Sequence, residues 1–179
     1  MSTIAPCPGC PYAGLAIGHR GHPASRIVLV GEAPGKKEIE AGRPLVGPAG
    51  HVLWEALAEA GLFEADLFIT NAVACLPQPV NPWVGAIDAC RGRLVRDIEA
   101  FPRSVIVTLG ATAFRAVTGQ RGFRMSEVRG RPVVSNWGPV VPTFHPARVR
   151  RVRRERPLLV EDLVLARRIA ASSDGALTR

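Results

Sequence analysis

The sequence predicts an α/β fold, a three-layer α/β/α sandwich around a mainly parallel, roughly four-stranded sheet. Short β-branched runs alternate along the chain with longer segments of helical periodicity, which is typical of strands joined by crossover helices. The chain has 179 residues, 47% of them hydrophobic. Residues 1–179 therefore suit a single domain, with a core large enough to need no disulfide.

The first half of the chain supplies two of these strands and one helix. Residues 26–30 (RIVLV) stop at a glycine, as a buried strand does. Residues 50–61 place their apolar side chains on one helical face and end at Gly61, a typical helix stop. Residues 66–70 (DLFIT) predict the second strand.

The second half repeats the alternation. An apolar stripe at helical spacing predicts a helix over residues 86–101, and the run SVIVTL predicts a third strand over 104–109. A proline in the first turn opens an amphipathic helix over 157–171. The remaining predicted elements are a helix over 110–117 and short strands over 132–134 and 140–142.

Three loops follow predicted strands and are rich in Gly, Pro and polar residues. Ligands of parallel sheets bind outside the carboxyl ends of the strands. The sequence therefore places the functional site in residues 31–50, 71–83 and 144–151.

The charge of the chain points to a polyanionic partner. Lys and Arg number 23 against 15 Asp and Glu, a net charge of +8, and six of the arginines lie within residues 148–156 (RVRRVRRER). Arginine binds phosphate through two parallel hydrogen bonds, so this block predicts nucleic-acid contact. Arginine codons of a GC-rich genome are the alternative explanation, but they explain the clustering less well.

The sequence also predicts where the protein works. No apolar run approaches the roughly 20 residues of a membrane span, and the first ten residues (MSTIAPCPGC) lack the features of a signal peptide. We therefore expect a cytoplasmic monomer without membrane contact.

Four cysteines suggest a metal site. A C-x2-C pair, Cys7 and Cys10, precedes Cys75 and Cys90, and cytosolic cysteines favour metal over disulfides. Spacing alone leaves zinc and an iron–sulfur cluster open, with ordinary core cysteines as the alternative to both.

Three further motifs are candidates for chemistry. The glycine-rich stretches GEAPG (31–35) and GRPLVGPAG (42–50) let backbone amides approach a ligand. Asn71, at the end of a strand, offers a donor and an acceptor for a base edge, or is an ordinary turn cap. His145 stands between prolines before the arginine block, where it is a candidate for polarising a reacting group.

Together these motifs resemble those of the family 4 uracil-DNA glycosylases, the iron–sulfur branch of the uracil-DNA glycosylase superfamily. The resemblance spans roughly residues 7–170 and rests on the order and spacing of its elements. These are C-x2-C, GEAPG, GRP-x-VG-x-AG, TN-x-x-x-C, a fourth cysteine on the next helix, TLGATA (108–113), VRG (128–130) and PT-x-HPA.

The resemblance implies an enzyme of base excision repair that removes uracil from DNA. It implies a [4Fe–4S] cluster held by the four cysteines, Cys7, Cys10, Cys75 and Cys90. It implies catalytic roles for His145 as donor to the uracil O2, for Glu32 in the pocket loop, and for Glu38 in positioning the attacking water. The base-binding residues that it implies are Gly31, Glu32, Ala33, Leu45, Asn71 and His145.

The chain departs from the family pattern at three places. Leu45 replaces the phenylalanine that stacks on the flipped base, which predicts weaker uracil binding or a pocket for another deaminated base, such as hypoxanthine or xanthine. Residues 76–83 (LPQPVNPW) lack the usual arginine. The aliphatic residues that the family inserts into the duplex are reduced to Val149 among arginines, so either Val149 or an arginine is expected to insert. The predicted DNA-binding residues are Arg148, Val149, Arg150 and Arg151.

One alternative belongs to another functional class. A non-catalytic iron–sulfur DNA-binding domain would also explain the cysteines and the arginine block. The presence of Glu32, Asn71 and His145 argues against it, because a protein that only binds DNA needs no base pocket.

Overall fold

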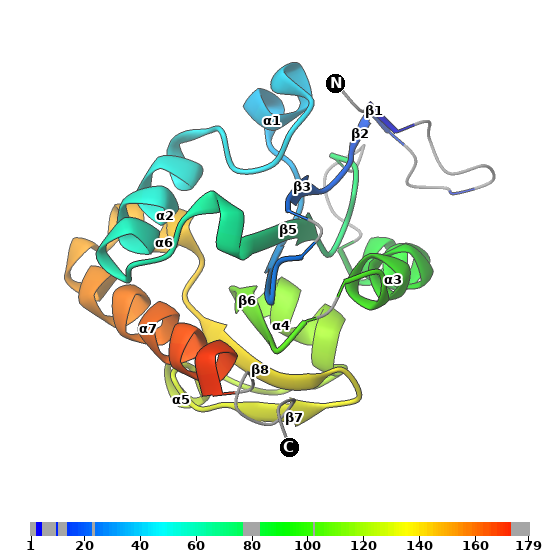
Figure 1. The fold of residues 1–179 in the computed structure, drawn as a ribbon. Helices are drawn as coiled ribbons and strands as arrows, with labels where there is room; N and C mark the ends of the chain where they lie inside the picture. Colours follow the sequence, from blue (N-terminus) through cyan, green and yellow to red (C-terminus); the bar gives the residue numbers. More distant parts are fainter. Residues whose placement is uncertain are drawn as a thin grey trace.

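A six-stranded sheet runs through the middle of the protein in the order β3-β5-β4-β6-β8-β7 (Figure 1). The computed structural model describes residues 3–4, 10, 14–22, 24–76, 83–101 and 103–172. The strands, in sheet order, are β3 (Arg20–Gly21), β5 (Leu67–Asn71), β4 (Ile27–Gly31), β6 (Val105–Leu109), β8 (Gly138–Thr143) and β7 (Val133–Ser135).

The four inner strands are parallel, and the two edge strands are antiparallel to their neighbours. The predicted α/β fold with a mainly parallel sheet is therefore confirmed, although the sheet has six strands where roughly four were predicted. All five predicted strands form, with bounds shifted by a few residues at most. The sixth strand, β3, has two residues and leaves no hydrophobic period in the sequence.

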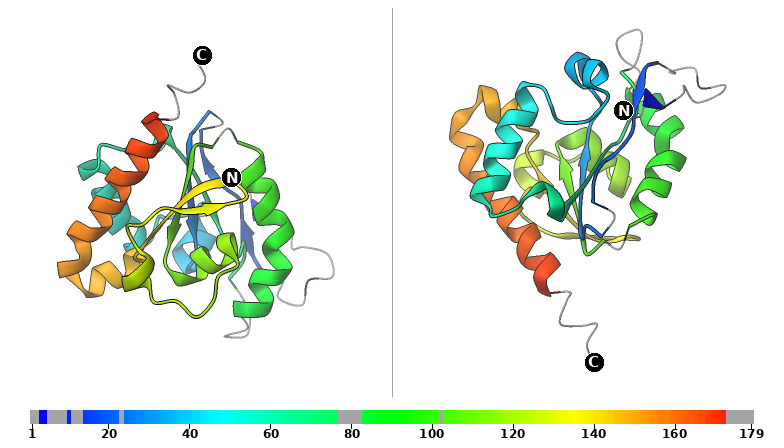
Figure 2. Two further views of the ribbon diagram at one scale, coloured as in Figure 1. Left: turned by 90° about the horizontal axis from the view of Figure 1, so that it is seen from below. Right: turned by 45° about the horizontal axis from the view of Figure 1, so that its top comes forward.

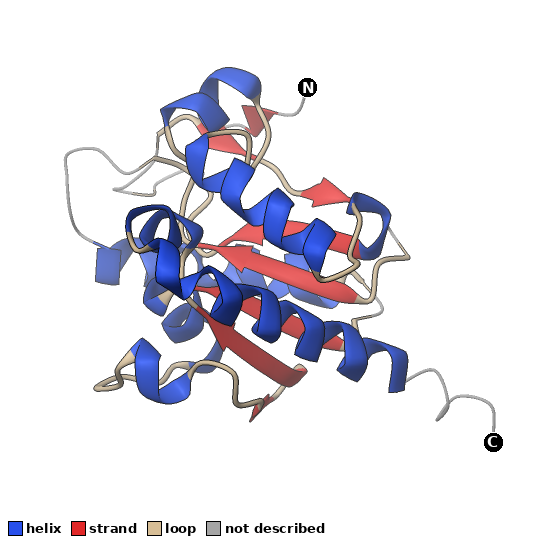
Figure 3. Ribbon diagram, turned by 90° about the vertical axis from the view of Figure 1, so that its left-hand side faces the viewer, coloured by secondary structure: helices blue, strands red, loops and turns tan. Residues whose placement is uncertain are grey.

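Helices cover both faces of the sheet, as the sandwich architecture requires. Figure 1 shows α2 (Pro48–Glu59), α6 (Pro146–Arg151) and α7 (Arg156–Ser172) on one side, and α3 (Trp83–Glu99) and α4 (Ala111–Thr118) on the other. Figure 2 shows the same separation from two further directions, and in Figure 3 the strands lie between the helices.

Successive side chains of the inner strands enter two different cores, because neighbouring residues of a strand point to opposite faces. On β4, Val28 and Val30 pack under α3 and α4, whereas Ile27 and Leu29 pack under α2 and α7. Both faces are thus fully buried, which explains why these strands are hydrophobic throughout instead of alternating.

Several small elements lie in segments for which the sequence predicted no such helix or strand. They are β1 (Thr3–Ile4), β2 (Ala16–Ile17), α1 (Lys36–Ala41), η1 (Glu64–Asp66), α5 (Met125–Val128) and η2 (Arg153–Glu155), and α6 likewise occupies the predicted loop 144–151. Each has at most six residues, too short for a periodic pattern to emerge. Of the helices described, none is both long and apolar enough to cross a membrane.

Candidate active site

The carboxyl ends of the four parallel strands bring the predicted site residues to one edge of the sheet. Gly31 ends β4 and lies opposite Asn71, which ends β5. Leu109 and Thr143, the last residues of β6 and β8, are paired with each other. Gly110 comes directly after β6, and His145 comes two residues after the end of β8. Across the sheet the order is therefore Asn71, Gly31, Gly110, His145.

Two glycines, Gly31 and Gly110, lie between the polar side chains of Asn71 and His145 in the sheet order. A Cβ atom at Gly31 would overlap the Oδ1 atom of Asn71, and a Cβ at Gly110 would come within 2.9 Å of the His145 Cβ. Gly110 also has a φ of 88°, which favours glycine. The Asn71 amide and the His145 imidazole therefore occupy space that side chains at Gly31 and Gly110 would otherwise fill.

The His145 ring is oriented by the start of the helix that follows it. His145 caps α6, and its Nδ1 atom accepts a hydrogen bond from the Ala147 N–H at 3.1 Å. Burial lowers the pKa of His145, the nearby Arg151 lowers it further, and Glu32 opposes both. A neutral ring that accepts at Nδ1 has its proton on Nε2, so His145 presents an N–H donor.

The loop after β4 is held to the neighbouring segment by backbone hydrogen bonds. Glu32 is half-buried and close enough to His145 for its charge to act on the imidazole. Its carbonyl accepts from the Val73 N–H at 2.9 Å, and the Gly31 carbonyl accepts from the Ala72 N–H at 2.8 Å. The loop 31–33 is therefore fastened to the segment that follows Asn71.

Glu38 fastens the two glycine-rich stretches to each other. Its carboxylate accepts hydrogen bonds from the N–H groups of Gly35 at 3.2 Å, Val46 at 3.0 Å and Gly47 at 2.6 Å. Both oxygens are engaged in this structure, which gives Glu38 a structural role that the sequence did not suggest. Its role in positioning water stays a prediction.

Leu45 adopts an unusual backbone conformation at the tip of the second stretch. Its φ of 59° is the one positive value at a non-glycine position in the described part of the chain. The Trp54 indole donates to the Leu45 carbonyl at 3.0 Å, and Gly50 lies against the same peptide, where a Cβ would overlap the carbonyl group. Strain of this kind persists only where neighbouring groups hold it, so the fold fixes Leu45 in place.

The end of β8 is anchored by a buried carboxylate. Thr143 donates its hydroxyl to Asp162 of α7 at 2.6 Å, and Arg129, the arginine of the VRG motif, pairs with the same carboxylate. Burial raises the pKa of Asp162, and the hydrogen bonds from Arg129 and Thr143, which lower this pKa, offset only part of the rise. The VRG motif therefore helps to hold the strand end that leads to His145.

Some arginines of the block pair with a carboxylate of the described residues, and others do not. Arg148 makes two hydrogen bonds to Glu155, at 2.7 and 2.6 Å, and lies over the Phe144 ring. Arg150 and Arg151 are exposed. Val149 is only 1% exposed and packs in the core. In this conformation the helical position of Val149 faces inward, and the contact of Val149 with DNA stays a prediction.

Three of the four predicted cluster ligands lie in the described part of the chain. Cys75 and Cys90 are buried in the same core cluster, and Cys10 and Cys90 are free thiols. Ala16 pairs with Cys75 in an isolated bridge, so the N-terminal segment runs beside it. Cys7 lies outside the described residues, among which no three metal-ligating side chains are close enough to hold an ion. Thiols are nonetheless the donors that iron–sulfur clusters take.

The sequence analysis did not single out two groups at this edge. Gly110 was hidden inside a helix prediction, although a glycine directly after a strand is a signal for close approach of a ligand or a backbone. Arg93 of α3 reaches the end of β5, and nothing in the sequence distinguishes it from the other arginines of that helix.

The chain is similar to known proteins over most of its length. A family model described as the uracil DNA glycosylase superfamily matches residues 19–165. A protein of Thermotoga maritima named Type-4 uracil-DNA glycosylase is 38% identical, over 92% of this chain and 89% of its own. A Type-4 uracil-DNA glycosylase of Pyrobaculum aerophilum is 36% identical, over 90% and 88%. A Type-5 uracil-DNA glycosylase of Thermus thermophilus is 32% identical, over 66% and 61%.

Proposed function

Because the chain belongs to the uracil DNA glycosylase superfamily, we propose that it hydrolyses the N-glycosidic bond of deoxyuridine in DNA. The products are free uracil and an abasic site, so the reaction serves DNA repair. The observation that most supports this proposal is the placement of two polar side chains, Asn71 and His145, against two glycines, Gly31 and Gly110, at one edge of the sheet. A base whose glycosidic bond is unreachable in the stack must be flipped out of the helix, and it then needs polar groups of the protein to bind it.

His145 acts as a donor to the uracil. When the C1′–N1 bond breaks, its electron pair stays with the base, and negative charge develops on the uracil O2. A fixed N–H donor at this position stabilises that charge as it forms. The hydrogen bond from Ala147 to Nδ1 and the lowered pKa of His145 both favour the neutral ring with its proton on Nε2.

Asn71 reads the base edge, and the first glycine-rich loop binds the rest of it. An amide offers one acceptor and one donor, matching the N3–H and O4 groups of uracil and rejecting the exocyclic amine of cytosine. We further propose that the backbone amides of Gly31, Glu32 and Ala33 bind the base, and that Leu45 contacts it without the stacking of an aromatic ring. Water attacks C1′ of the sugar and completes the hydrolysis.

We also propose that Cys7, Cys10, Cys75 and Cys90 hold a [4Fe–4S] cluster. Bound there, the cluster supplies a structural cross-link between the N-terminal segment, the segment after β5 and α3. The burial of Cys75 and Cys90 in one core cluster supports the proposal. Arg150 and Arg151 are exposed, as are Arg153 and Arg154, and we propose that Arg150 and Arg151 bind the DNA backbone.

Excision of another deaminated base is the second candidate function, favoured by Leu45. Base release from labelled oligonucleotides carrying one central uracil, hypoxanthine or xanthine, or a thymine–guanine pair, followed by alkaline cleavage, separates the two. We expect cleavage at uracil, and its loss in His145→Ala. Cleavage at another base alone would favour the second candidate. Binding of DNA without any base release would favour a non-catalytic domain.

A further inference from the structure

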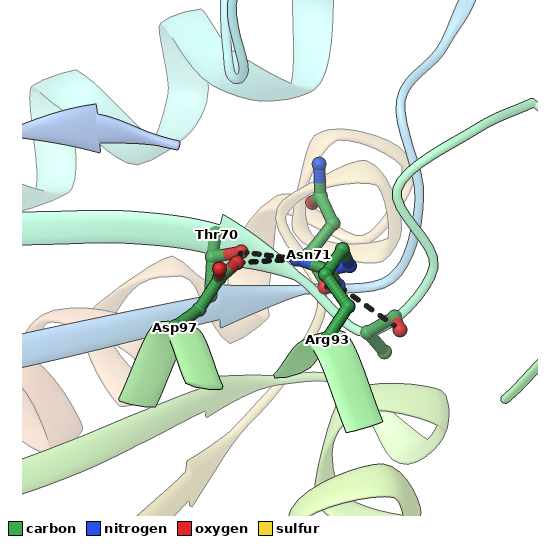
Figure 4. Close-up of polar contacts among 5 residues, drawn as sticks. Thr70, Asn71, Arg93 and Asp97 are labelled. Carbon is green, nitrogen blue, oxygen red and sulfur yellow. Dashed lines mark hydrogen bonds and ion pairs between the residues drawn. The ribbon is translucent and has the colours of Figure 1, made fainter. Parts of the chain in front are cut away.

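Arg93 crosses from α3 to the end of the strand that carries Asn71. Its guanidinium donates to the backbone carbonyls of Asn71 and Ala72, the latter at 3.4 Å, and to the Thr70 hydroxyl at 3.1 Å. Figure 4 shows Arg93 and Asp97 projecting from α3 to this point, with the side-chain amide of Asn71 directed away from them.

Asp97 fixes the guanidinium in this orientation. Arg93 and Asp97 form an ion pair one helical turn apart, and Asp97 also accepts a hydrogen bond from the Thr70 hydroxyl at 2.7 Å. The Arg93 side chain is 13% exposed, so it is largely removed from water. A planar guanidinium can bridge several acceptors at once, which an ammonium group cannot do.

The segment that Arg93 holds is itself the support of the first pocket loop. The N–H groups of Ala72 and Val73 bind the carbonyls of Gly31 and Glu32. The carbonyl side of the segment therefore binds Arg93, and its N–H side binds the pocket loop. A shift of this segment would move the Asn71 amide and the Gly31–Glu32 backbone together.

We propose that Arg93 is a positioning residue for base recognition, which sets the backbone of Asn71 and, through Ala72 and Val73, the loop at Gly31. This inference rests on the proposed function, because it concerns the same pocket. Arg93 touches no substrate; it acts through the segment that it holds. Cys90 lies one turn earlier on α3, so the same helix joins the cluster ligand to the pocket.

A role in stability alone is the competing explanation, and the chain offers a matched control for it. Arg103 follows α3 and is also half-buried, and its guanidinium likewise donates to two backbone carbonyls, of Ile98 at 3.1 Å and Phe101 at 3.4 Å. Those carbonyls lie before β6, at the opposite edge of the sheet from the pocket. Loss of Arg103 therefore costs stability without moving Asn71.

The experiment compares the full-length wild type with Arg93→Met, Arg93→Lys and Arg103→Met at a temperature where all remain folded. Single-turnover release of uracil should fall roughly 10- to 100-fold in Arg93→Met, the size expected for a displaced binding group. Arg93→Lys should fall less, and Arg103→Met should match the wild type. Affinity for DNA that contains no uracil should be the same in all four proteins.

Hydrogen exchange supplies a readout that does not depend on activity. The amides of Ala72 and Val73 should exchange faster in Arg93→Met than in the wild type, while those of β6 should not change. If the wild type releases no base, the proposed function fails, and exchange still tests whether Arg93 holds the segment. If the wild type is active and Arg93→Met equals Arg103→Met in rate or in exchange, the inference is wrong.

Discussion

The backbone of Gly110 lies so close to His145 that a Cβ atom at Gly110 would come within 2.9 Å of the histidine's own Cβ. The glycine opens α4 and the histidine opens α6, so two helix starts meet at this contact. This contact explains the glycine in the motif TLGATA, because a side chain at position 110 would collide with His145.

Gly110→Ala should therefore impair catalysis as well as stability. The new methyl group would push His145 from its place, and alanine is strained at the backbone angles of Gly110, with φ at 88° and ψ at 176°. We expect about 1–3 kcal/mol lower stability and a roughly 100-fold slower single-turnover release of uracil. Thermal melts and single-turnover kinetics measure the two effects.

Gly119→Ala is the matched control for that substitution. Gly119 ends the same helix at a φ of 74°, but open space surrounds the position of its Cβ. It should lose about 1–2 kcal/mol of stability from the backbone alone and keep the wild-type rate. Equal rates in the two variants would show that the contact with His145 is unimportant.

Leu45→Phe should strengthen the binding of the flipped uracil. Leucine and phenylalanine are both unbranched at Cβ, so the strained backbone of Leu45 is equally accessible to either. Stacking of a ring on the base adds about 1–3 kcal/mol, or roughly tenfold in KM for each 1.4 kcal/mol. Steady-state kinetics on uracil and hypoxanthine substrates test this, with Leu45→Met as control. An unchanged KM in Leu45→Phe would place residue 45 outside the base pocket.

The fold was predictable because its signals are local. Each inner strand is a short hydrophobic run, and at the ends of β4 and β6 a glycine stops it, which the sequence displays directly. The edge strand β3 was not predictable, since two residues paired only through the backbone leave no pattern. The same strand-end logic placed Asn71 and His145 at one edge of the sheet.

The parts of the site that escaped prediction depend on contacts between distant residues. Val149 looks like an exposed wedge among arginines, yet its helical phase turns it into the core. Arg148 looks like its neighbours, but Glu155 lies within reach of it only once α6 and η2 have folded. The resemblance implied that Glu38 positions the attacking water, and the three N–H groups that donate to it come from loops whose path the sequence does not reveal.

The activity should persist into mildly acidic solution because the pKa of His145 is lowered. The folded pKa lies below the unfolded value of about 6.5, so the stability that neutral His145 contributes is complete above that value and is lost as the pH falls through the folded pKa. The single-turnover rate should likewise decline only below the ordinary histidine pKa. NMR titration of His145 and a pH–rate profile measure this.

The variant Arg151→Ala tests whether Arg151 lowers the pKa of His145. Arg151 lowers the pKa of His145, so its removal should raise that pKa and move the acid limb of the rate profile to higher pH. Arg154→Ala, also an exposed arginine, should leave the limb where it is. A limb that moves to lower pH in Arg151→Ala would contradict this electrostatic account.

Glu38→Gln should loosen the two glycine-rich stretches. Glutamine keeps one acceptor oxygen and brings an NH2 group against a backbone N–H, so at least one donor is left unpaired, at a cost of about 1–3 kcal/mol. We expect a lower melting temperature together with slower release of uracil, and neither effect in Glu40→Gln on the exposed side of the same helix. A slower rate at unchanged melting temperature would instead support a role for Glu38 in positioning water.

The arginine block should contribute to DNA binding unequally. Each phosphate contact adds about 0.9 to the slope of log affinity against log salt concentration, and Arg150 and Arg151 are free to make such contacts. Arg150→Ala with Arg151→Ala should therefore reduce the slope by up to about 2. Arg148→Ala should change it little, because Arg148 is held by Glu155, and should lower the melting temperature instead. Filter binding across a salt series, with melts of the same proteins, measures both.

A slope that falls as much in Arg148→Ala as in an Arg150→Ala variant would mean that the ion pair with Glu155 opens on DNA, and that the whole block binds phosphate.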